Sequence, residues 1–179
     1  FILWFFLLVL KFNKKLLMTI GKVKITNSFD IKFGFLTIHG QGGKKLIEKA
    51  KQAAFEIKSK PEIMMVTILT SLSDNDLKDM GNENTVVDQV KKLAKLASDM
   101  NVGIVCSGHE AKIVRKIIGQ KLLIFTPGIR MEKDLKNDQK RVCTPAESLI
   151  NGASKIIMGR SLIKGNIEDM WNIGRGSQK

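Results

Sequence analysis

The chain of 179 residues is long enough for one domain with a buried core. Its 44% hydrophobic and 26% charged residues are typical of a globular protein and exclude a disordered or collagen-like chain. The net charge of +13 indicates an anionic partner. The basic residues are mostly dispersed lysines and Tyr is absent, which argues against a nucleic-acid partner.

The first predicted element is a buried strand over Phe1–Leu10, an unbroken apolar run that ends at Lys11. A membrane-spanning helix needs about 20 such residues, so we expect no membrane partner. A signal peptide would carry its positive charges before the apolar residues and not after them, and a signal-peptide remnant is the less favoured alternative. The weakly patterned stretch 13–30 is predicted to be helical.

From residue 33 onward, apolar runs and amphipathic stretches alternate along the chain. The runs predict strands at Phe33–His39, Ile63–Leu69, Val102–Cys106, Leu122–Phe125 and Ser154–Met158. The first predicted helix, Lys44–Lys58, buries Leu46, Ala50, Ala53 and Ile57. The second buries Val86, Val90, Leu93, Ala97 and Met100. Capping-box spacing predicts helix starts at Ser107, for a helix ending at Ile118, and at Thr144, and a final helix follows Gly159-Arg160.

This alternation predicts an α/β fold, a parallel sheet with helices outside it. No dinucleotide GxGxxG motif follows a predicted strand, which favours part of a TIM-type (β/α) barrel over a Rossmann sheet. A complete barrel has about 250 residues and eight strands, whereas this chain has room for about six β/α units. We therefore expect a single, incomplete barrel domain over residues 1–179, with strands missing from its front.

The carboxyl ends of the predicted strands are the candidate functional positions, because barrels carry their chemistry there. Gly159-Arg160 follows the last strand, where a helix N-terminus often binds phosphate. Arg160 would add a permanent charge with two donors, although most arginines are surface charges. His39 also ends a strand, but without a second ligand or a carboxylate we interpret it as structural.

The cysteines and histidines give no indication of a metal centre. Cys106 and Cys143 form no CxxC pair, and no His or Cys residues have ligand spacing. Without a disulfide framework, the simplest compartment for the chain is the reducing cytoplasm.

Six ordered segments carry a resemblance to a known family. They are Leu36–Gly43 (LTIHGQGG), Val66–Ser71 (VTILTS), Thr126–Arg130 (TPGIR), Asp138–Val142 (DQKRV), Thr144–Glu147 (TPAE) and Ile157–Arg160 (IMGR). In this order and at this spacing they resemble orotidine 5'-monophosphate decarboxylase, over residues 33–165. The resemblance implies a cytoplasmic, homodimeric carboxy-lyase of pyrimidine biosynthesis that converts orotidine 5'-monophosphate to uridine 5'-monophosphate and CO2 without a cofactor.

The resemblance also implies roles for individual residues. Lys11 would donate the proton to the carbon that loses CO2, and Thr19 matches the threonine of the same catalytic segment if one residue is inserted. The residues implied to bind the nucleotide are Thr70 and Arg130, with Gln139 bridging phosphate and base, and Gly159 and Arg160 holding the phosphate.

One segment departs from the family pattern Asp-Leu-Lys-Phe-His-Asp. Val9 and Lys14 replace its two aspartates, and a second positive charge near Lys11 should lower the pKa of that lysine. We therefore expect phosphate binding to be retained and decarboxylation to be weak. The alternatives are a non-catalytic remnant and another phosphate-binding barrel of the superfamily, such as a hexulose-phosphate synthase, which would not explain TPGIR followed by DQKRV.

Overall fold

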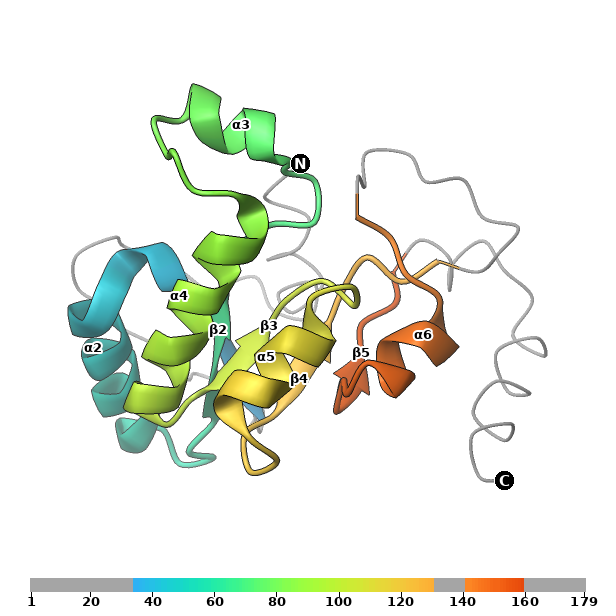
Figure 1. Ribbon diagram of the computed structural model, residues 1–179. Coiled ribbons are helices and arrows are strands. Elements are labelled where there is room, and N and C mark those ends of the chain that lie inside the picture. The colour runs from blue at the N-terminus through green and yellow to red at the C-terminus, as the bar shows by residue number, and fades with distance from the viewer. Residues whose placement is uncertain (1–33, 131–140, 160–179) are drawn as a thin grey trace.

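The computed structural model describes residues 34–130 and 141–159, which form a parallel sheet with helices packed on it (Figure 1). The elements in chain order are β1 (Phe35–His39), η1 (Gly40–Gly42), α2 (Gly43–Glu56), β2 (Glu62–Val66), α3 (Asp74–Asp79), α4 (Val86–Met100), β3 (Gly103–Val105), α5 (Ala111–Ile118), β4 (Ile124–Thr126), α6 (Pro145–Ile150) and β5 (Lys155–Ile156). The predicted elements over 1–10 and 13–30 and the final helix lie outside the described residues.

The five strands pair in chain order, β1-β2-β3-β4-β5, and every pairing is parallel. The register sets Met64 beside Gly103 and Ile104 beside Ile124. All five described strands overlap the predicted apolar runs and are shorter than these, but β2 begins one residue earlier than predicted and β4 ends one residue later. The parallel α/β arrangement is confirmed. Because all five described strands run in the same direction, their carboxyl ends lie at one edge of the sheet.

Both faces of the sheet are apolar, as expected for parallel strands covered on both sides. Ile63 and Met65 of β2 belong to the larger core under the helices, whereas Met64 and Val66 belong to a second cluster with Val105 and Phe125. The alternation follows the two-residue period of a strand. Figure 1 shows α2, α4 and α5 next to one another over the first of these faces.

The buried face of α2 differs from the prediction at two of four positions. Ile47, Ala50, Ala54 and Ile57 are buried, whereas Leu46 and Ala53 are half-buried. Leu46 instead covers Gly42, where an added Cβ would lie 2.1 Å from the Leu46 Cδ2. In α4, four of the five predicted residues are buried and Met100 is half-buried.

The predicted helix start at Ser107 is wrong, because α5 begins at Ala111. The Ser107 N–H donates to the Glu110 carboxylate (3.2 Å), which is one half of a capping box. The other half does not form, since the Glu110 N–H donates to the Ser107 carbonyl (3.0 Å) and not to its hydroxyl. The predicted capping box at Thr144 and Glu147 is confirmed at the start of α6.

A short helix that the periodicity did not predict, α3, follows β2. A capping box between Ser73 and Asp76 begins it, with the Ser73 N–H donating to the Asp76 carboxylate (2.7 Å). The Asp74 carboxylate then accepts from the Val86 N–H (2.6 Å), which joins α3 to the first turn of α4. Within 34–130 and 141–159, none of the helices has the length and apolar character needed to span a bilayer.

Candidate functional site at the carboxyl edge of the sheet

Two of the predicted binding segments meet at the carboxyl edge of the sheet. Thr70 follows β2 and is buried. Gly128, in the TPGIR segment after β4, lies directly against it, since a Cβ added at Gly128 would be 3.3 Å from the Thr70 Cγ2. Residues from β2 and β4 are therefore in contact, although β3 separates these strands in the sheet.

The TPGIR segment is held by a short bridge to the chain before α6. The Arg130 N–H donates to the Cys143 carbonyl (3.0 Å), and the Cys143 N–H donates to the Gly128 carbonyl (3.2 Å). Ile129 and Cys143 form a parallel bridge between these bonds. Arg130 is buried, and its Nη1 donates to the Ile129 carbonyl (2.9 Å). These hydrogen bonds therefore hold the backbone of the predicted binding residue Arg130 in place.

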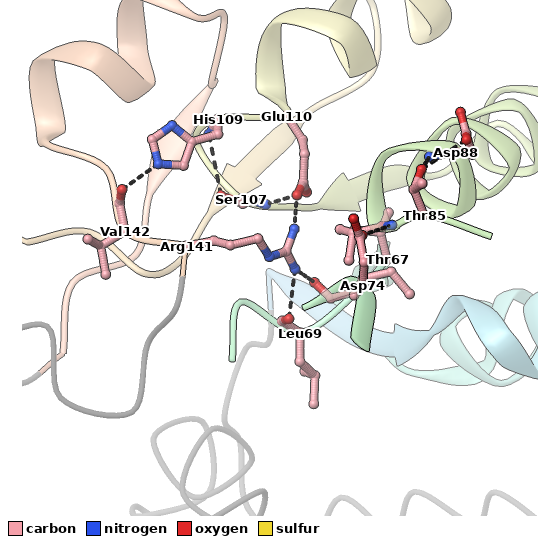
Figure 2. Close-up of polar contacts among 12 residues, drawn as sticks. Thr67, Leu69, Asp74, Thr85, Asp88, Ser107, His109, Glu110, Arg141 and Val142 are labelled. Carbon is pink, nitrogen blue, oxygen red and sulfur yellow. Dashed lines mark hydrogen bonds and ion pairs between the residues drawn. The ribbon is translucent and has the colours of Figure 1, made fainter. Parts of the chain in front are cut away.

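The Arg141 side chain contacts several segments at this edge, as Figure 2 shows. Its Nη2 donates to the carbonyls of Leu69 (2.7 Å) and Ile68 (3.1 Å) after β2. Its Nη1 forms an ion pair with the buried carboxylate of Glu110. Its backbone N–H donates to the Thr70 carbonyl (3.1 Å). One residue therefore joins the segments that follow β2, β3 and β4.

Burial governs the electrostatics of this pair. It lowers the pKa of the Arg141 guanidinium, which nevertheless stays protonated because an arginine begins so far above neutral pH. Glu110 compensates that charge and also accepts from the Ser107 N–H after β3. The sequence predictions assign neither residue to the site: Glu110 falls in the capping-box spacing that begins at Ser107, and Arg141 occurs only within the DQKRV segment. Only the fold brings them together, and the sequence contains no local signal for their pairing.

Gly159 lies at the same edge, shortly after β5. The Ile157 N–H donates to the Thr126 carbonyl (2.8 Å), which holds this end of the chain beside β4. A Cβ added at Gly159 would meet no atom of the described residues within 4 Å, so none of them covers this backbone. The other predicted site residues, Lys11, Thr19, Gln139 and Arg160, lie outside the described residues.

Two cysteines and one histidine are the remaining candidate groups among the described residues. Burial raises the pKa of the Cys106 thiol to about 12 and that of Cys143 to about 11, so both are protonated at neutral pH. His39 is half-buried at the end of β1. In the described segments, His, Cys, Asp and Glu side chains form no group of three that could hold a metal ion.

Parallel strands in chain order and helices on the outside together define a protein of the β/α-barrel class, and the polar cluster at the carboxyl edge is its candidate site. The chain belongs to the orotidine 5'-phosphate decarboxylase / HUMPS family, whose model matches residues 22–167.

Similar proteins with curated names support this assignment. Orotidine 5'-phosphate decarboxylase of Buchnera aphidicola subsp. Schizaphis graminum is 39% identical over 134 residues, which are 74% of this chain and 57% of that protein. The enzyme of the same name from Hydrogenovibrio crunogenus is 41% identical over 128 residues, 71% of this chain and 54% of that protein. The chain thus spans a little over half the length of these relatives.

Solved structures agree on the fold. The crystal structure of orotidine 5'-phosphate decarboxylase from Lactobacillus acidophilus matches with a TM-score of 0.66 and 30% identity, covering 81% of this chain and 63% of that one. An uncharacterised conserved protein from Geobacillus kaustophilus matches with a TM-score of 0.62 at 22% identity, covering 82% of this chain and 64% of that one, which supports the fold alone.

Proposed function

We propose that the chain binds orotidine and uridine 5'-monophosphate at the carboxyl edge of its sheet, as a single-domain carboxy-lyase of pyrimidine biosynthesis. The contact between Thr70 and Gly128, beside the buried Arg130, supports this proposal most directly. It joins two separate motifs that the resemblance assigns to one nucleotide site. The relatives named orotidine 5'-phosphate decarboxylase provide further support.

The role proposed for each residue follows from its chemistry. Gly159 offers a backbone that a phosphate can approach closely, and Arg160 supplies a forked, permanent charge. Thr70 and Arg130 contact the nucleoside part from the ends of β2 and β4, and Gln139 bridges base and phosphate. We further propose that the protein acts in the cytoplasm as a homodimer without a cofactor, as the resemblance implies.

Titration calorimetry with uridine 5'-monophosphate tests the binding proposal. Arg160→Ala removes a charged pair of donors and is expected to weaken binding about 10- to 100-fold. Lys112→Ala, which removes one positive charge from an exposed position on α5, is the control and should leave the dissociation constant unchanged. Absence of heat with the parent chain, or equal affinity of parent and Arg160→Ala, would contradict the proposal.

The catalytic part of the proposal concerns Lys11, Val9 and Lys14. Decarboxylation places negative charge on the substrate carbon, which a lysine ammonium can stabilise and then protonate. If these residues match the catalytic segment of the family, Lys14 would favour the neutral form of Lys11 by like-charge repulsion, and Val9 would lack the carboxylate that holds the ammonium in place. We therefore propose that the substrate binds better than it reacts.

Loss of orotidine 5'-monophosphate absorbance measures the turnover. The parent chain is expected to be far slower than a full-length decarboxylase assayed beside it. The double substitution Val9→Asp with Lys14→Asp should raise its rate by about tenfold or more, because it restores the negative charges around Lys11. Val87→Asp with Lys44→Asp makes the same two exchanges at exposed positions of α4 and α2 and should leave the rate unchanged. A parent rate equal to that of the full-length enzyme would refute the proposed weakening.

A further inference from the structure

We propose that the Glu110–Arg141 ion pair is a positioning device for the nucleotide site: it holds Thr70 and the Gly128–Arg130 segment in the geometry that the ligand requires. Its role in binding rests on the function proposed above. Both residues are positioning residues, since they act through the backbone of their neighbours. The binding residues named above do not include either of them.

The ion pair connects the segments that follow β2 and β3. The Arg141 guanidinium binds the carbonyls of Ile68 and Leu69, immediately before Thr70. The Glu110 carboxylate accepts from the Ser107 N–H, which fixes it to the end of β3. The end of β2 is therefore connected to the end of β3 through two side chains, at a place where the ladder between these strands has stopped.

The backbone around Arg141 is also hydrogen-bonded to the candidate site. Its N–H donates to the Thr70 carbonyl (3.1 Å), and two residues later Cys143 exchanges hydrogen bonds with Gly128 and Arg130. Moving Arg141 would therefore move the bridge that supports Arg130 and the glycine that contacts Thr70. The side-chain pair and the backbone bridge form one connected network around the candidate site.

A buried ion pair contributes more to the positions of the segments it connects than to the net stability of the fold. Desolvation offsets much of the attraction between two buried charges, so their net contribution to the free energy of unfolding is small. Removing one partner, however, leaves the other charge uncompensated in a region of low dielectric. The planar guanidinium also fixes direction, because its Nη1 faces Glu110 while its Nη2 faces the two carbonyls.

The chain contains a matched control at the other edge of the sheet. Arg115 of α5 is half-buried and donates to the carbonyls of Gly119 (2.7 Å), Leu122 (2.8 Å) and Gly152 (2.8 Å). These acceptors lie before β4 and β5, away from the strand ends that carry Thr70 and Arg130. Arg115→Lys and Arg141→Lys therefore make the same chemical change at opposite edges.

Amide hydrogen exchange tests the structural claim without a ligand. In Arg141→Lys and in Glu110→Gln, protection of the Arg130 and Cys143 N–H groups should fall at least about tenfold relative to the Ile104 N–H, which bonds the Leu123 carbonyl (2.8 Å) in the middle of the sheet. In Arg115→Lys, the ratio of protection at these sites should equal that of the parent. Unchanged ratios in both site variants would overturn the proposal.

Calorimetry with uridine 5'-monophosphate tests the functional claim on the same proteins. Arg141→Lys and Glu110→Gln should each weaken binding about tenfold, and the double variant should lose no more than either single variant, because the pair acts as a unit. Arg115→Lys should bind as the parent does. Full affinity in both site variants, or equal losses in Arg115→Lys, would overturn the positioning role.

The two readouts separate this inference from the proposed function. If the parent chain does not bind the nucleotide, the proposed function fails. The exchange ratios at Arg130 and Cys143 still decide whether the ion pair holds the strand ends. If the parent binds and the exchange ratios do not change, the function stands and the positioning inference is wrong.

Discussion

Gly128→Ala is expected to reduce the affinity for uridine 5'-monophosphate at least about tenfold, because the added methyl group would displace its neighbours in the site by a few tenths of an ångström. The new Cβ would lie 3.1 Å from the Arg141 carbonyl and 3.3 Å from the Thr70 Cγ2. The first of these neighbours is backbone and cannot turn away. The backbone of Gly128 also has a φ of +73°, which an L-residue adopts only with strain.

Gly119→Ala separates the steric effect from the backbone effect. Gly119 has a nearly identical φ of +69°, but a Cβ there would meet nothing within 4 Å. Both variants should lose about 1–3 kcal/mol in the free energy of unfolding from backbone strain. Only Gly128→Ala should lose affinity in calorimetry at a temperature where both variants are folded. Equal affinities of the two variants would show that the Thr70–Gly128 contact does not support binding.

Arg115→Met is expected to produce the largest loss of stability among the substitutions considered, about 3 kcal/mol or more in the free energy of unfolding. Its guanidinium makes five hydrogen bonds, two of them to the Gly152 carbonyl and one to the Ser154 hydroxyl (2.9 Å). The Ser154 Oγ in turn accepts from the Ile124 N–H (3.0 Å) at the start of β4. Removing the guanidinium leaves the half-buried Leu122 and Gly152 carbonyls without this donor, whereas the exposed Gly119 carbonyl can bond water.

Urea unfolding measures this loss, with Lys116→Met as the control. Lys116 is the next residue of α5 and is exposed, so its substitution removes the same charge from the same helix without removing a buried partner. The control should stay within about 0.5 kcal/mol of the parent. A midpoint for Arg115→Met equal to that of Lys116→Met would show that these hydrogen bonds contribute nothing net.

Apart from α3 and the short η1, the order and type of the described elements could be predicted from the sequence, because apolar runs and helical periodicity are local signals. The buried face of α2 could not. Leu46 and Ile47, and likewise Ala53 and Ala54, are adjacent apolar residues, so two overlapping sets fit a period of 3.6 equally well. The position of the helix on β1 and β2 decides between them. The short helix α3 begins with a Ser73-x-x-Asp76 capping box, and this spacing would have predicted its start.

The candidate site divides in the same way. The segments containing Thr70, Arg130 and Gly159 could be placed at strand ends from local pattern, and the structure brings the first two together through Gly128. Glu110 and Arg141 could not be paired from the sequence, because their contact depends on β2, β3 and β4 lying side by side. A long-range ion pair has no periodicity, so only three-dimensional packing reveals it.

The chain-order arrangement of the strands has a consequence for how the domain assembles. Every described strand pairs in parallel with its sequence neighbours, so no two of them can meet through a tight hairpin. Each ladder forms only after an intervening helical crossover has closed a loop, at an entropic cost that precedes the gain from pairing. The nearest neighbour in space is nevertheless always the nearest strand in sequence. Each described strand can therefore pair with the strand before it, which has already been synthesised. The sheet can grow in the order in which the ribosome releases the chain.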